Sequence, residues 1–188
     1  MLPYPKTRLL FFDLETVGEY AKLTDLQQNK PGLYKVFMKY QDWFVKKFPE
    51  DKDKTMDEIY ETRAALVPEF AKIVVASFAF INQDGKMQKQ TFAMDDEKEL
   101  LRNVIKLLNK VNKLNFFLCG HNIKGFDIPM LFKRMMINGF QPATILPTAE
   151  TKPWDIKALD TKEFWNGTNP FTIAQLELIS VAMDCDSS

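Results

Sequence analysis

The chain has 188 residues, with 25 Lys and Arg, 25 Asp and Glu and a single His, so its formal net charge is zero. Its composition, 46% hydrophobic and 27% charged, is that of a globular protein and excludes a disordered or collagen-like chain. The neutral charge excludes a basic tail that binds nucleic acid through bulk charge. No apolar run approaches the roughly 18 residues of a membrane helix. We therefore expect one cytoplasmic domain over residues 1–188 with no membrane partner.

Short apolar segments predict the strands of a sheet. Residues 8–14 are apolar and rich in aromatics, which is typical of a buried strand. Residues 72–81 are apolar at both parities and predict a central strand, which pairs across a turn with a returning strand over 86–92. Residues 115–119 predict a third core strand, and residues 153–156 predict a short one.

Helical periodicity follows the hairpin. The acids of residues 95–97 open a helix whose apolar residues recur at helical spacing from Leu100 to Val111. A second helix runs to about Asn138, with Gly139 just beyond its end. Residues 172–175 have the form of a capping box and predict a last helix. The order of these elements predicts an α/β domain with a mixed sheet.

A helical insertion is expected over residues 18–69, between the first two strands. Five aromatic residues from Tyr34 to Phe48 follow helical spacing up to Pro49 and are interpreted as core. Residues 55–58 form a second capping box, which leads a helix to about Leu66.

Two acids close the first strand. Asp13 and Glu15 are two residues apart, so both side chains face one side if the strand continues through them. Charged residues are almost never buried without a partner. Either these acids lie at a solvated turn or they share a hard divalent cation, which prefers carboxylate oxygens.

A polar loop over residues 120–129 follows the third core strand and precedes a helix. Ligands of open α/β sheets bind beyond the carboxyl ends of such strands. Asp127 is open to two interpretations, a helix N-cap or a functional acid. His121, the only His, is either a loop residue bonded to the backbone or part of a site.

Together the two segments carry a family resemblance. FDLET at 12–16 and HNIKGFDIP at 121–129 resemble the first and second motifs of the DEDD 3′–5′ exonucleases, and most closely the proofreading exonuclease domain of family B DNA polymerases and stand-alone proteins built like it. The resemblance implies a ribonuclease-H-like mixed five-stranded sheet flanked by helices, with the helical insertion after its first strand. It also implies two Mg²⁺ or Mn²⁺ ions on three acidic ligands: Asp13, Glu15 and Asp127.

The resemblance further implies a substrate and a mechanism. The residues that correspond to those holding the 3′-terminal nucleotides of a single DNA strand are Thr16, His121, Asn122 and Phe126. The expected activity is two-metal hydrolysis of single-stranded DNA from its 3′ end. An exoribonuclease of the same superfamily and a catalytically incomplete nucleic-acid-binding module are the alternatives. We also hypothesise that the insertion, which follows Glu15, lines the single-strand groove.

The third motif of this family, a Tyr or His followed four residues later by Asp, is missing from the sequence. The last Tyr is Tyr60, and neither Asp184 nor Asp186 has a Tyr or His four residues before it. We therefore expect a truncated form that lacks the helix carrying this motif, or a degenerate member. In both cases the chain is expected to be weakly active or inactive, because catalytic groups that act as a unit fail together.

Overall fold

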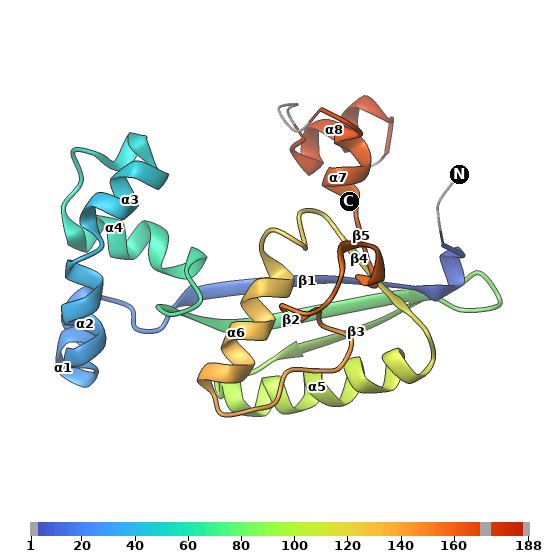
Figure 1. Ribbon diagram of the computed structural model, residues 1–188, viewed down its shortest axis with the longest axis horizontal. Coiled ribbons are helices and arrows are strands. Elements are labelled where there is room, and N and C mark those ends of the chain that lie inside the picture. The colour runs from blue at the N-terminus through green and yellow to red at the C-terminus, as the bar shows by residue number, and fades with distance from the viewer. Residues whose placement is uncertain (1–3, 170–173, 186–188) are drawn as a thin grey trace.

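A computed structural model describes residues 4–169 and 174–185 of the chain. Its centre is a five-stranded sheet in the order β3-β2-β1-β4-β5 (Figure 1). β1 pairs antiparallel with β2 and parallel with β4, which is itself parallel to β5, so the predicted mixed five-stranded sheet is confirmed. The strands are β1 (Leu9–Gly18), β2 (Ala71–Ile81), β3 (Met87–Ala93), β4 (Phe117–Gly120) and β5 (Ala158–Asp160).

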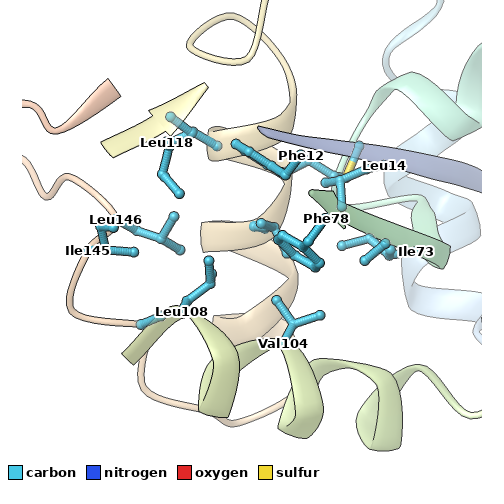
Figure 2. Close-up of a cluster of buried hydrophobic side chains, with 14 of the residues drawn as sticks. Phe12, Leu14, Ile73, Phe78, Val104, Leu108, Leu118, Ile145 and Leu146 are labelled. Atoms are coloured by element: carbon cyan, nitrogen blue, oxygen red, sulfur yellow. The ribbon is translucent and has the colours of Figure 1, made fainter. Parts of the chain in front are cut away.

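The main core lies between one face of the sheet and two helices, α5 (Glu97–Lys113) and α6 (Asp127–Ile137). Phe12 of β1 and Phe78 of β2 point toward Val104 and Leu108 of α5 (Figure 2). Both helices were predicted, and Asp96 caps α5 by accepting a hydrogen bond from the amide of Lys98, 2.8 Å away. Among residues 4–169 and 174–185, the opposite face of the sheet carries a small hydrophobic cluster around Leu9, Cys119 and Leu159. That face is consequently the more open one.

The predicted insertion is helical and has a core of its own, beside one end of the sheet (Figure 1). Phe37 lies at its centre, with the rings of Tyr60 and Phe70 edge-on to it at centroid distances of 5.2 and 5.0 Å. The helices of the insertion are α1 (Leu23–Asn29), α2 (Pro31–Met38), α3 (Gln41–Lys47) and α4 (Met56–Arg63), with 3-10 turns at Pro49–Asp51 and Ala64–Leu66.

Two predictions for the insertion had different outcomes. The capping box of Thr55 and Glu58 is present at the start of α4, as predicted. The interpretation of the five aromatic residues as core is wrong for Tyr40, which is 44% exposed, because the chain breaks between α2 and α3. Phe37 and Phe44 are fully buried, as expected of core residues. The break lets both rings reach one small core from two short helices.

The last part of the described chain departs from the prediction. Residues 153–156 are not a strand, because Pro153 opens a 3-10 turn (Pro153–Asp155), in which the Asp155 amide bonds the Lys152 carbonyl. The strand is β5, which begins two residues after the end of the predicted one and is buried beside β4. Two short helices follow, α7 (Thr161–Asn166) and α8 (Leu176–Ala182). Gln175 is the N-cap of α8 without a side-chain cap, and Thr172 and Asp186 lie outside the described residues.

Among residues 4–169 and 174–185, no helix is both long and apolar enough to cross a membrane.

Candidate active site

Asp13 and Glu15 lie on the open face of the sheet. β1 continues through both residues, which pair with Ser77 and Val75 of β2, and a register shift follows Glu15. Leu14 between them is buried in the main core, whereas the two acids are exposed. Side chains alternate along a strand, so the expectation that the two acids share a face is confirmed.

Asp127 is brought to the same stretch of β1 from 113 residues away. It is the first residue of α6, with Phe126 at the N-cap position, so it is not itself the cap. Its side chain is 4% exposed, and its Oδ1 accepts a hydrogen bond from the Leu14 amide at 3.1 Å. The acid of the second motif is therefore anchored to the residue that separates the two acids of the first.

The electrostatics around Asp127 are unfavourable for its charge. Burial, the largest cause, acts together with the charges of Asp13 and Asp160 to raise the pKa of its carboxyl to about 7, although hydrogen bonds from its own amide and from the Leu14 amide lower it. The ion pairs of residues 4–169 and 174–185 do not include Asp127. A buried acid surrounded by acids is the situation that a bound cation would relieve.

Close backbone packing shapes the loop between β4 and α6. A Cβ on Gly120 would lie 2.8 Å from the Phe12 carbonyl and 2.3 Å from a methyl of Ile123, so only glycine lets β4 end this close to β1. Asn122 has a left-handed backbone with φ of 60°, and its Oδ1 accepts a hydrogen bond from Lys162 Nζ at 3.2 Å. Phe126 is half-buried against the main core.

His121 is held by two hydrogen bonds. Its Nδ1 lies 3.0 Å from the Thr161 hydroxyl, and its Nε2 lies 2.6 Å from the Ala174 carbonyl. The ring thus ties the end of β4 to α7 and to the segment that precedes α8. A role in binding nucleic acid stays a prediction for this residue.

Two hollows lie along β1. One, about 570 Å³ in volume, includes Asp13, Ser77, Lys89 and His121 in its lining on the open face. The other, about 520 Å³, lies between the end of β1 and the insertion and includes Thr16 in its lining. The Thr16 hydroxyl donates to the Ala65 carbonyl at 2.8 Å, so this residue joins the strand to the insertion.

The sequence over residues 2–167 matches the family described as "DNA polymerase family B, exonuclease domain". The chain belongs to this family. A solved structure of the family B DNA polymerase from the archaeon Pyrobaculum calidifontis is similar to it, with a TM-score of 0.55 and 13% identity over 95% of this chain and 18% of that one. The structure of E. coli exonuclease I in complex with a dT13 oligonucleotide has a TM-score of 0.46 and 11% sequence identity, over 96% of this chain and 36% of that one. A search of the curated proteins with this sequence found no match.

The fold of this exonuclease domain is therefore the predicted ribonuclease-H-like one, a mixed five-stranded sheet with flanking helices. The chain spans less than two fifths of the length of either solved protein. Both segments on which the sequence resemblance was based lie within the matched region, since FDLET ends at Thr16 and HNIKGFDIP at Pro129.

The sequence did not point to one further buried acid that lies beside the loop of residues 120–129. Asp160 ends β5, is 3% exposed, and accepts hydrogen bonds from the amides of Asn122, Lys124 and Lys162. The signal that marks Asp13, an acid directly after a short apolar strand, is also present at Leu159 and Asp160. It was hidden because the short strand was predicted over residues 153–156.

The donor set fits a hard divalent cation, which exonuclease domains of this kind generally require. Asp13, Glu15 and Asp127 offer only carboxylate oxygens, the ligands that Mg²⁺ and Mn²⁺ accept together with water and substrate phosphate. In the described part of the chain no three Asp, Glu, His or Cys side chains are grouped tightly enough to enclose an ion by themselves.

Proposed function

We propose that this exonuclease domain hydrolyses single-stranded DNA from its 3′ end with the help of two divalent cations, Mg²⁺ or Mn²⁺. The observation that carries the proposal is the hydrogen bond from the Leu14 amide to Asp127, which brings the second-motif acid to the strand between Asp13 and Glu15. Membership of the exonuclease family gives the reaction class.

In this proposal Asp13, Glu15 and Asp127 hold the cations. The bound ions would supply a water of lowered pKa and would stabilise the charge on the attacking and leaving oxygens. The protein contributes two exposed acids fixed by strand pairing and one buried acid whose pKa is raised by burial and by Asp13. Cation binding favours the ionised form of that buried acid, so metal affinity is expected to increase as the pH rises toward neutrality.

The strand would be held by residues on either side of these acids. Asn122 presents its amide beside Lys162, and Phe126 keeps a partly exposed ring at the start of α6. Base stacking on an aromatic ring is worth about 1–3 kcal/mol and tolerates any sequence. Thr16 lines one hollow, and His121 lines the other together with Asp13. We place the last nucleotides of the strand between Thr16 and His121.

We further propose that the 188 residues are a weak catalyst by themselves. They contain no Tyr or His with Asp four residues later, so neither a fourth acid nor a group that orients the attacking water is supplied in the pattern of the family. Missing both should reduce the rate by several powers of ten, because each 1.4 kcal/mol of barrier is about tenfold.

The test is digestion of a 5′-labelled single-stranded DNA oligonucleotide and of the matching RNA with Mn²⁺. The wild type and Asp53→Ala, which removes an exposed acid of the insertion, should give the same slow 3′–5′ ladder on DNA. Asp13→Ala, or added EDTA, should abolish it. Faster degradation of the RNA than of the DNA would show that RNA is the preferred substrate. A ladder that survives Asp13→Ala, or binding without any ladder in the wild type, would contradict the proposal.

A further inference from the structure

Asp160 is a buried acid whose two carboxylate oxygens both accept hydrogen bonds from backbone amides. Its Oδ1 accepts from the amides of Asn122 at 2.8 Å and Lys162 at 2.9 Å, and its Oδ2 accepts from the Lys124 amide at 3.0 Å. The side chain is 3% exposed. A carboxylate whose oxygens accept from three amide donors has little capacity left for a cation.

Two of these three amides belong to the loop that carries Asn122 and leads to Phe126. The carboxylate holds the amide of residue 122, where the backbone is left-handed, and the amide of residue 124 two positions on. The neighbouring helix α7 supports the same loop, through the ion pair of Glu163 with Lys124 at 2.6 Å. Asp160 is thus the point at which the loop, β5 and α7 are joined.

The proposed metal ligands depend on other contacts. Asp13 and Glu15 are fixed by the pairing of β1 with β2, and Asp127 is fixed by the Leu14 amide and the start of α6. Removing the carboxylate of Asp160 should therefore disturb the loop before it disturbs the three acids.

On this basis we propose that Asp160 is a positioning residue for the substrate strand, which sets the loop of Asn122 and Phe126 without binding metal or substrate. The inference rests on the proposed function. It predicts a separation of two properties: loss of carboxylate 160 weakens binding of a 3′-ended single strand and leaves the response of the protein to Mn²⁺ in place.

Asp160→Ser makes the separation measurable. Serine is as good an N-cap as aspartate, so the hydroxyl can still serve the Lys162 amide at the start of α7, but one hydroxyl cannot also serve Asn122 and Lys124. Asp96→Ser is the matched control, because Asp96 caps α5 through an equivalent bond to Lys98 and supports no loop of the site. Asp160→Asn is the graded variant, since its single oxygen can keep the bonds to Asn122 and Lys162 and loses the one to Lys124.

Two measurements are made on each variant: the Kd for a 5′-labelled dT12 whose 3′-terminal linkage is a phosphorothioate, in Mn²⁺, and the rise in melting temperature caused by Mn²⁺ alone. We expect Asp160→Ser to raise the Kd at least about tenfold, Asp160→Asn to raise it less, and Asp96→Ser to leave it unchanged. The Mn²⁺-induced rise should be the same in all four proteins.

The inference is overturned if Asp160→Ser binds dT12 as Asp96→Ser does, or if the Mn²⁺ response disappears together with binding. Should Asp160→Ser fail to fold, Asp160→Asn decides in the same way, with wild-type affinity as the contradicting result. A wild type that neither binds dT12 nor responds to Mn²⁺ overturns the proposed function as well, and so differs from a failure of this inference alone.

Discussion

Asp51 in the insertion and Asp127 at the sheet are both buried acids, but their surroundings are opposite in charge. Arg63 donates to both carboxylate oxygens of Asp51 and Lys54 lies 2.8 Å from it, and these hydrogen bonds lower the pKa of Asp51 to about 2. Burial and the charge of Asp13 raise the pKa of Asp127 to about 7. The insertion neutralises Asp51 with the basic side chains of Arg63 and Lys54, whereas Asp127 has no basic side chain among its described ion-pair partners.

Glu97, a further buried acid, shows that compensation is available close to the site. Glu97 begins α5 and packs against α6, where Arg134 donates to both of its oxygens. The Ile73 amide and the Asn138 side chain also donate to it. Asp127 lies on α6, as Arg134 does, but has no basic side chain paired with it among the described ion pairs. Perturbed acids without a structural partner are concentrated at functional sites, so the contrast itself supports the assignment of Asp127.

The largest change in stability is expected when a compensated acid is made to resemble Asp127. Arg134→Met leaves the Glu97 carboxylate buried without its cation, and removing one partner of a buried ion pair costs about 3–5 kcal/mol of unfolding free energy. Urea denaturation of the wild type and the variant at neutral pH measures the loss of unfolding free energy.

Lys133→Met is the control on the same helix. Lys133 pairs with Glu69 at 2.9 Å, with both side chains about half exposed, and such surface pairs contribute at most about 1 kcal/mol. Equal losses of unfolding free energy for Arg134→Met and Lys133→Met would show that the buried ion pair stabilises the fold no more than a surface pair does. The contrast between Glu97 and Asp127 would then lose its support.

A stabilising effect is expected from Asp127→Asn. The pKa of Asp127 is about 7 in the folded protein, against an ordinary value of 3.8. Between about pH 4 and pH 7 the folded wild type therefore keeps a proton on this carboxyl that the unfolded chain has lost. This protonation stabilises the wild type fully below about pH 4, and the stabilisation is lost as the pH rises through 7. Asparagine keeps an acceptor for the Leu14 amide and carries no charge, so at pH 8 and without metal the variant should be more stable by up to about 4 kcal/mol.

Denaturation of wild type and Asp127→Asn from pH 4 to pH 8 in EDTA tests this sign. The two curves should separate with rising pH, and Mn²⁺ should narrow the gap by stabilising only the wild type. A variant that is less stable than wild type at pH 8 would mean that the ionised carboxylate is compensated after all, and the comparison with Asp51 would fail.

The sheet and the shared face of the two acids on β1 could be predicted because their signals are local. Apolar runs mark β1 and β2, and the alternation that places Asp13 and Glu15 on one face follows from the strand itself. The capping box of Thr55 is equally local. For Asp127, family resemblance was needed, because the residue reaches β1 only through the fold.

The features that were missed depend on tertiary contacts. β5 has three residues, too few for a periodic signal, and it is a strand because β4 offers it a parallel partner. Asp160 could not be assigned while that strand was misplaced. The break between α2 and α3 lets Phe37 and Phe44 pack at a centroid distance of 5.2 Å, a contact that their spacing alone does not reveal.

The smallest effect is expected from the cap of α4, far from any buried acid of the site. Thr55→Ala removes the hydroxyl that accepts from the Glu58 amide, and loss of such a cap costs about 1 kcal/mol. The melting temperature should fall by roughly 2–4 °C, whereas the Mn²⁺-induced rise and its pH dependence should match the wild type. If Thr55→Ala also reduced the Mn²⁺ response, the insertion and the site would be coupled through Thr16 and Ala65, where the strand meets the insertion. Equal responses would show that the two regions are energetically separate, each with its own way of managing a buried charge.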